Sequence, residues 1–171
     1  MPSAGFEPIV SAGARVLVLG SLPGRVSLEM QQYYAQARNA FWPIMGRLLC
    51  FEPEMPYKRR LATLKKCRIA LWDVCASADR IGSLDSAIVN SSVRPNDFVA
   101  FFAGYGNITS VYFNGAKAAA LYNNLVMPGL PPNLQQLEYV SLPSTSPAHA
   151  GMTFAEKLRR WSRVRRASDT Y

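Results

Sequence analysis

The chain has 171 residues, 49% of them apolar, which is enough for the core of one domain but leaves no apolar run long enough for a membrane span. Nineteen Lys and Arg against eleven Asp and Glu give a formal charge of +8, a common footprint of proteins that bind polyanions. Three cysteines without metal-type spacing and a single histidine argue against a zinc or iron–sulfur centre, so we expect no metal and no other cofactor.

Residues 1–13 contain Pro, Ser and Gly with little periodicity, which predicts an extended lead-in. They lack the charged-then-apolar layout of a signal peptide, so we expect a cytoplasmic protein. We predict that residues 1–171 form a single domain, with residues 167–171 as a frayed tail.

Four short apolar runs predict strands, at residues 15–20, 68–72, 110–113 and 137–142. Helical spacing predicts helices over residues 41–49, 57–67, 98–105 and 116–124, and from a capping box at Thr153 and Glu156 onward. Residues 75–85 are predicted to be a loop rich in Ser and Gly. Strands that alternate with helices indicate an α/β fold with a mainly parallel sheet covered on both faces.

The stretch from residue 20 to residue 42 follows the first predicted strand, where open α/β sheets place their ligands. Its glycines let the backbone come close to a ligand, Tyr33 and Tyr34 offer flat faces, and Asn39 offers an amide with a donor and an acceptor. These features suit a pocket for a planar ring. The alternative is an Ω-like loop with buried aromatic residues, in which Asn39 is only the N-cap of the next helix.

Each predicted strand ends in a polar, turn-forming group: Gly20-Ser21, Asp73, Asn114-Gly115 and Pro143-Ser144. The ends of parallel strands lie on one edge of a sheet, so these loops are expected to converge there. The fourth loop could present its small hydroxyl residues to a phosphate. The first loop lacks the features of a P-loop or a dinucleotide fingerprint, which argues against a nucleotide-metabolising α/β enzyme.

Basic residues gather in two segments. The six in residues 58–68 are interpreted as a solvated helix face. The last helix has an apolar stripe that is expected to face inward, made of Phe154, Leu158, Trp161 and Val164. Its outward face is basic, with Arg159, Arg163 and Arg166.

Three segments resemble the signature motifs of a known family: GSLPG at residues 20–24, YYAQARNAFW at 33–42 and PSTSPAHAG at 143–151. The family is the uracil-DNA glycosylase superfamily, and the resemblance is to its hypoxanthine-DNA glycosylase branch in particular. The segments LWDV, SLDSAI and FNGAKA are similar to that branch too, so the resemblance covers most of residues 14–160. It implies a three-layer α/β/α sandwich with a central four-stranded parallel sheet.

The resemblance implies a DNA repair enzyme that flips a deaminated base, preferably hypoxanthine, out of DNA. Water then hydrolyses the N-glycosidic bond without a metal or other cofactor and leaves an abasic site. The expected partner is double- or single-stranded DNA, and the protein is expected to act as a monomer away from membranes. Two alternatives stay open on the same fold, namely a uracil or mismatch-specific uracil glycosylase and a DNA-binding module without catalysis.

The resemblance also implies roles for single residues. Leu22 stands where many members carry a water-activating Asn or Asp, so the catalytic amide is expected at Asn39, with His149 either catalytic or in contact with phosphate. The implied base-binding residues are Gly20, Ser21, Leu22, Tyr34, Phe41 and Asp73. The loop that grips the phosphate backbone and wedges the helix, together with the last helix, supplies the DNA-binding residues Ser144, Thr145, Ser146, His149, Arg160 and Arg163.

Several of these assignments have plain structural alternatives. Tyr34 could be a core residue and Asp73 a helix cap or turn former, while Asp85 and Asn114 are interpreted as turn residues. An ionised Asp73 would accept the ring N–H of a lactam base and repel the carbonyl beside it, so another donor must meet that carbonyl. On this basis we expect inosine to be preferred to uracil, and Asp73→Asn to relax that preference.

Overall fold

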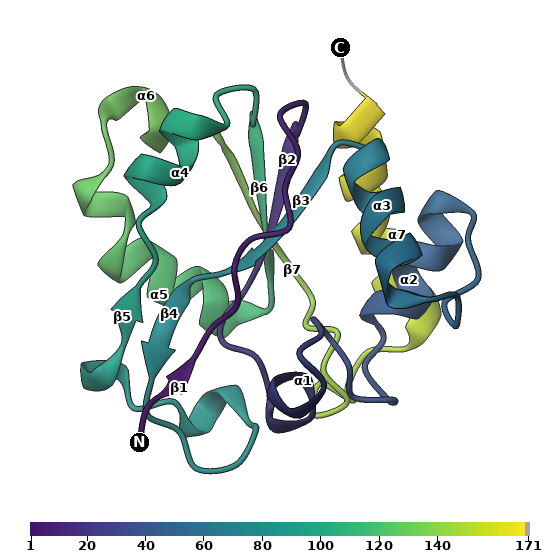
Figure 1. Cartoon of the computed structure of the whole chain (residues 1–171), viewed down its shortest axis with the longest axis horizontal. Helices are drawn as coiled ribbons and strands as arrows, with labels where there is room; N and C mark the ends of the chain where they lie inside the picture. Colours follow the sequence, from purple (N-terminus) through teal and green to yellow (C-terminus); the bar gives the residue numbers. More distant parts are fainter. Residues whose placement is uncertain (170–171) are drawn as a thin grey trace.

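The computed structural model describes residues 1–169, and its centre is a sheet of four parallel strands (Figure 1). The strands are β2 (Val16–Gly20), β3 (Ile69–Asp73), β6 (Ser110–Asn114) and β7 (Glu138–Leu142), in the order β3-β2-β6-β7. Their register places the final residues side by side, with Gly20 opposite Asp73 and Asn114 opposite Leu142. The predicted parallel sheet is confirmed.

Helices cover both faces of this sheet, which confirms the predicted three-layer α/β/α arrangement (Figure 1). One layer consists of α2 (Phe41–Leu49), α3 (Tyr57–Lys66) and α7 (Phe154–Asp169). The other consists of α4 (Phe98–Gly104), α5 (Ala116–Leu125) and α6 (Pro132–Gln135). No helix within residues 1–169 combines the length and the apolar character needed to cross a membrane.

Strand β2 contributes to two hydrophobic cores because alternate side chains of a strand point to opposite faces. Val16 and Val18 pack in the cluster under α2, α3 and α7, whereas Leu17 and Leu19 pack in the cluster under α4 and α5. All five residues of β2 are buried, as expected for a central parallel strand with a nearly continuous apolar sequence. Burial from both sides holds the end of β2, and with it the start of the next loop.

A second, three-stranded antiparallel sheet was not predicted. It has the order β1-β4-β5 and consists of β1 (Ser3–Ala4), β4 (Cys75–Ala78) and β5 (Arg94–Pro95). The lead-in is therefore tied to the fold, and the expected loop at residues 75–85 begins as a strand. Short strands of small and polar residues, such as the sequence CASA of β4, carry no alternation from which a strand could be predicted.

Helix α7 begins with the predicted capping box, in which the Thr153 N–H donates to Glu156 Oε2 (2.8 Å) and the Glu156 N–H donates to Thr153 Oγ1 (3.2 Å). Trp161 is fully buried as expected, but Phe154 at the first position of the helix is 40% exposed instead of facing inward. The expected tail from residue 167 is helical as far as Asp169, and the last two residues of that prediction lie outside the described part of the chain.

Candidate active site

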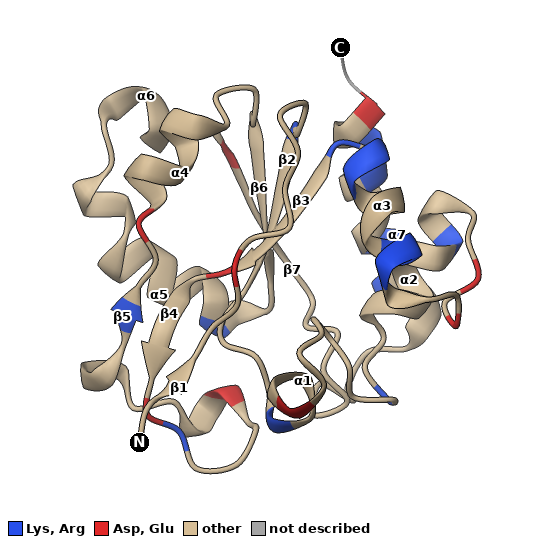
Figure 2. Cartoon of the chain, in the orientation of Figure 1, with Lys and Arg blue, Asp and Glu red and all other residues tan. Residues whose placement is uncertain are grey.

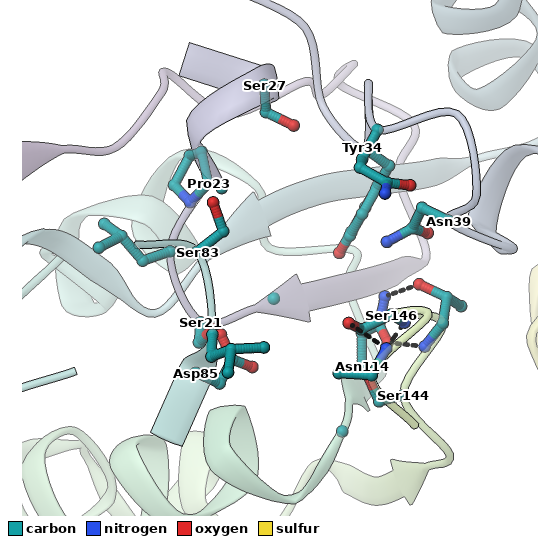
Figure 3. Close-up of a pocket in the computed structure, with 18 of the residues that line it drawn as sticks. Ser21, Pro23, Ser27, Tyr34, Asn39, Ser83, Asp85, Asn114, Ser144 and Ser146 are labelled. Atoms are coloured by element: carbon teal, nitrogen blue, oxygen red, sulfur yellow. Dashed lines mark hydrogen bonds between the residues drawn. The ribbon is translucent and has the colours of Figure 1, made fainter. Parts of the chain in front are cut away.

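The carboxyl ends of the four parallel strands surround a cavity of about 650 Å³ (Figure 3). The loop after β2 forms one wall and includes the short helix α1 (Arg25–Met30). Residues 33–39 and residues 144–149 form further walls, and residues 83–86 close the remaining side. The structure thus gathers at one edge the stretch of residues 20–39 and segments that lie far from it in the sequence, at residues 83–86, 114–117 and 144–149.

Ten of the predicted site residues line this cavity: Gly20, Ser21, Leu22, Tyr34, Asn39, Asp73, Ser144, Thr145, Ser146 and His149. Phe41 does not line it, because its side chain is fully buried. The Phe41 ring stacks on the Tyr34 ring with 4.2 Å between centroids and 29° between planes. Phe41 therefore supports the Tyr34 ring from behind and has no open face for a base.

Arg160 and Arg163 lie on α7 outside the cavity, although the sequence of that helix is rich in Lys and Arg (blue in Figure 2). Arg163 is 3.5 Å from the carboxylate of Glu138, the first residue of β7, and so lies towards the opposite edge of the sheet. The role of Arg163 as a DNA contact is not supported by this position. The cations at the cavity are ones that the sequence did not single out, namely Arg25, Arg38 and Lys117.

Tyr34 has a left-handed backbone conformation, with φ of 54°, which is rare for a bulky residue and costs free energy. Burial, with a smaller contribution from the charge of Asp73, raises the pKa of Tyr34 well above its usual range. The hydroxyl is therefore a donor. The Asn114 side chain interacts with it and opposes the rise in the pKa of Tyr34, but no acceptor for the hydroxyl hydrogen is found within residues 1–169. A buried donor without an acceptor is unusual in a native protein and indicates a place for a ligand acceptor.

Glycine is the only residue type that fits at position 20, the end of β2. A Cβ atom there would lie 2.5 Å from Asp73 Oδ1 and 2.9 Å from the Tyr34 hydroxyl oxygen. Both polar atoms consequently reach the same point on the floor of the cavity. The other carboxylate oxygen of Asp73, Oδ2, is also buried and lacks a hydrogen-bond partner within residues 1–169. Base-edge groups of a ligand could pair with these atoms.

Asp73 is only 4% exposed, and burial, with a smaller contribution from the charge of Asp85, raises the pKa of its carboxyl group to about 7. The Arg80 guanidinium opposes this shift. Near neutral pH a large share of the molecules therefore carries a neutral Asp73, which both donates and accepts a hydrogen bond. This corrects the sequence-based argument, which assumed an ionised carboxylate that only accepts.

The raised pKa predicts how stability depends on pH. Between about pH 4 and pH 7 the unfolded chain releases the Asp73 proton while the folded protein keeps it, so rising pH favours unfolding, at a cost on the order of 4 kcal/mol at most. Asp73→Asn removes this titration. We expect the melting temperature of the variant, minus that of the wild type, to grow by several degrees between pH 4 and 7 and then to level off. A difference that is constant with pH would contradict a buried, titrating Asp73.

Asn39 lies one position before the Ala40 N-cap of α2, and its Oδ1 accepts from the backbone N–H of Phe41 (2.9 Å). Asn39 therefore satisfies the first backbone N–H of α2, as predicted, although it lies one residue before the N-cap position. This hydrogen bond sets the orientation of the amide and leaves Nδ2 pointing towards the cavity (Figure 3). The Asn39 side chain can donate to a water molecule or a base from there.

The other asparagine of the cavity, Asn114, is already engaged. Its Nδ2 donates to Thr145 Oγ1 and its Oδ1 accepts from the Thr145 N–H, both at 2.9 Å (Figure 3). Thr145 is 1% exposed, and its carbonyl accepts from the Ala40 N–H (2.9 Å). Thr145 therefore holds the fourth loop in place and is not available to a phosphate, which corrects its assignment as a DNA contact.

The remaining polar groups of that loop face solvent or the cavity. Ser144 Oγ accepts from the Ser146 N–H (3.1 Å), and Ser146 Oγ accepts from the Ala148 N–H (3.2 Å). Each hydroxyl hydrogen is thus left to donate to a phosphate oxygen. His149 is exposed, and its carbonyl accepts from Lys157 Nζ (2.8 Å), which ties the loop to α7.

Residues 83–86 form a wall that sequence reasoning missed, and Arg80 braces it from outside the cavity. Asp85 looked like a turn residue, and Arg80 carried no signal in the sequence. Ser21 Oγ donates to Asp85 Oδ1 (2.6 Å), and the Arg80 guanidinium donates to the carbonyls of Leu22 and Pro23. These bonds join the loop after β4 to the loop after β2. The wall therefore fixes the segment in which the resemblance places the first signature motif.

The chemistry of the cavity rests on an amide, a carboxyl group, hydroxyls and an aromatic ring. Burial raises the pKa of the nearby Cys75 thiol to about 12, so this cysteine is not a nucleophile at neutral pH. Within residues 1–169 no three His, Cys, Asp or Glu side chains are placed to share a metal ion. The groups present suit recognition of a polar ring edge and positioning of a water molecule.

Comparison with known proteins agrees with this arrangement. A family model of the uracil DNA glycosylase superfamily matches residues 7–165. The chain is 35% identical over 119 residues to a hypoxanthine DNA glycosylase of Methanosarcina barkeri, covering 69% of this chain and 74% of the relative. A hypoxanthine DNA glycosylase of Methanosarcina acetivorans is 37% identical over 119 residues, with the same coverage.

A solved structure shares the whole architecture. It is an NMR structure of a Methanosarcina acetivorans protein that is described as a candidate uracil DNA glycosylase. It superposes with a TM-score of 0.81 at 32% identity and covers 99% of this chain and 100% of its own. The chain therefore belongs to the uracil DNA glycosylase superfamily and is a DNA glycosylase.

Proposed function

We propose that this DNA glycosylase removes hypoxanthine from deoxyinosine in DNA and leaves an abasic site. The observation that carries the proposal is the floor of the cavity, where Asp73 Oδ2 and the Tyr34 hydroxyl are buried without hydrogen-bond partners. Hypoxanthine presents a ring N–H beside a carbonyl. A neutral carboxyl group can accept from the first and donate to the second. The names of the two relatives also favour this base.

In the proposed mechanism the extruded base lies against the Tyr34 ring, which Phe41 backs. Cleavage of the glycosidic bond places negative charge on the departing base and positive charge on the sugar. The hydrogen bonds to the base carbonyl strengthen as the charge grows, because they are buried and already oriented. Asn39 Nδ2 holds the attacking water, which needs little activation at a centre that resembles an oxocarbenium ion.

Uracil is the second candidate substrate, since it presents the same pair of a ring N–H and a carbonyl. The name of the NMR structure points to this base. A purine and a pyrimidine differ in reach, because the lactam edge of hypoxanthine lies one ring further from the sugar. Asp73 is a buried lining residue of the cavity, and we propose that the longer base brings its lactam edge within reach of this carboxyl group.

The proposal can be tested with labelled duplex oligonucleotides of one sequence that carry a single inosine or a single uracil. After incubation with excess enzyme, alkali cleaves any abasic site and reveals base release. We expect cleavage at inosine to be at least about tenfold faster than at uracil. Faster release of uracil would overturn the proposed substrate, and release of neither base would favour a DNA-binding module without catalysis.

A further inference from the structure

The loop between β4 and β5 places exposed apolar side chains beside the active-site cavity. Ile81 is 92% exposed and Leu84 is 55% exposed, and Leu84 also lines the cavity. Single exposed aliphatic residues are common on protein surfaces. Ile81 does not line the cavity itself, but it lies two positions before Ser83, which does. The tip of this loop therefore presents exposed apolar groups close to the cavity of a DNA glycosylase.

Hydrogen bonds hold this tip in a defined position. Gly82, with φ of 79°, makes a turn that other residues adopt with strain, and Arg80 pairs with Ile88 in an antiparallel bridge. Ser83 Oγ accepts from the Arg25 N–H (3.0 Å), which anchors the tip to the start of α1. The exposure of Ile81 is therefore a property of a braced loop, and little conformational entropy is lost when it makes a contact.

The opposite rim of the cavity offers no comparable side chain. In Figure 3, Ser83 and Asp85 lie on one side of the cavity, and Ser144 and Ser146 lie on the other. Both loops are at the same end of the molecule in Figure 1. Residues 144–151 are all Ser, Thr, Pro, Ala, His or Gly, without a bulky aliphatic side chain. That loop was expected from the resemblance to wedge the DNA helix. It has no large apolar group as far as Gly151, and the first one after it is the partly buried Met152, just before α7.

We propose that Ile81, at the tip of the loop between β4 and β5, enters the base stack of duplex DNA beside the extruded nucleotide. The proposal rests on the proposed function, since it needs a base to leave the stack. Extrusion costs a few kcal/mol of lost stacking, and a wedge of apolar atoms in the gap offsets part of this cost. Arg25, whose backbone N–H bonds Ser83, carries an exposed guanidinium 3.8 Å from the Glu29 carboxylate, and this group provides a cation for the flanking phosphate.

The test compares Ile81→Ser with the control Val99→Ser, which alters a 46% exposed valine on α4, away from the cavity. Both side chains are exposed, so we expect neither substitution to affect folding. Single-turnover release of hypoxanthine is measured from a duplex and from the same strand without its complement. We expect Ile81→Ser to be at least about tenfold slower on the duplex and unchanged on the single strand. The control should match the wild type on both.

A second measurement reports insertion without catalysis. With 2-aminopurine placed next to the inosine, binding of the wild type should raise its fluorescence, and binding of Ile81→Ser should raise it much less. Equal duplex rates and equal fluorescence for Ile81→Ser and the wild type would overturn the proposal. The proposal would also be overturned if Phe154→Ser lost the activity on the duplex while Ile81→Ser kept it. Phe154 is the first residue of α7 and is 40% exposed.

The two proposals fail in different ways. If the wild type released no base from either form of DNA, the proposed function would be wrong. The fluorescence on the bound duplex would still decide whether Ile81 enters the stack.

Discussion

Replacement of Asn39 by alanine is expected to slow single-turnover release of hypoxanthine by about two to three orders of magnitude, the usual loss for one preorganised polar group at a reacting centre. Asn39 Oδ1 is engaged by the Phe41 N–H, and Nδ2 faces the cavity, so the amide can hold a water molecule in a fixed position. Affinity for DNA should hardly change, since we expect the phosphate contacts to come from other loops. Rapid-quench assays at saturating enzyme and fluorescence anisotropy measure the two quantities.

Asn39→Asp is the matched control for folding. It keeps an acceptor for the Phe41 N–H, whereas Asn39→Ala loses that bond at the start of α2 and should cost about 1 kcal/mol of stability. Urea unfolding separates this loss from the catalytic one. If the Nδ2 donor does the work, Asn39→Asp is as slow as Asn39→Ala although its stability is normal. Excision by Asn39→Ala at the wild-type rate would remove Asn39 from the mechanism.

The rate of hypoxanthine release by the wild type should be level below pH 7 and fall about tenfold for each further pH unit. The pKa of Asp73 is raised to about 7, chiefly by burial. Above that value the carboxylate loses its donor and faces the carbonyl of the base, which becomes more negative as the bond breaks. The ionised form therefore opposes the transition state, and the neutral form stabilises it.

Asp73→Asn offers the same donor and acceptor at every pH and should give a flat profile. Its rate at pH 6 should stay within about tenfold of the wild type, and it should exceed the wild type at pH 9. In Asp85→Asn the rate should begin to decline at a lower pH than in the wild type, because the charge of Asp85 helps to keep Asp73 protonated. A wild-type rate that rises through pH 7 would show that the ionised form of Asp73 is the active one.

Most of the framework could be predicted from local patterns. The apolar run of β2 and the capping box of α7 each consist of a few neighbouring residues. The structure that each adopts therefore depends little on distant parts of the chain. The convergence of strand ends follows from parallel topology alone. Residue chemistry singled out Asn39 and Tyr34, the resemblance implied their roles, and both line the cavity.

The remaining features depend on contacts between distant segments. Asp85 accepts from Ser21 across 64 positions, and nothing in a Ser- and Gly-rich stretch marks that partnership. The protonation of Asp73 follows from its burial, which only the packed structure reveals. Arg163 had the right charge and was assigned to the wrong edge, because helical periodicity gives the side of a helix and not the place along it that faces a cavity.

Thr145 links the two halves of the chain, since its carbonyl accepts from Ala40 and its side chain and N–H bond Asn114. A nascent or partly folded chain that has paired β3, β2 and β6 has the floor for a base, but it has no β7 to bring the loop with Thr145 across. Strand β7 is the last of the four strands in the sequence, so a chain made from its N-terminus gains the loop with Thr145 only after the other three strands. A fragment that ends before β7 lacks the wall made by residues 144–149, and we expect it to release no base.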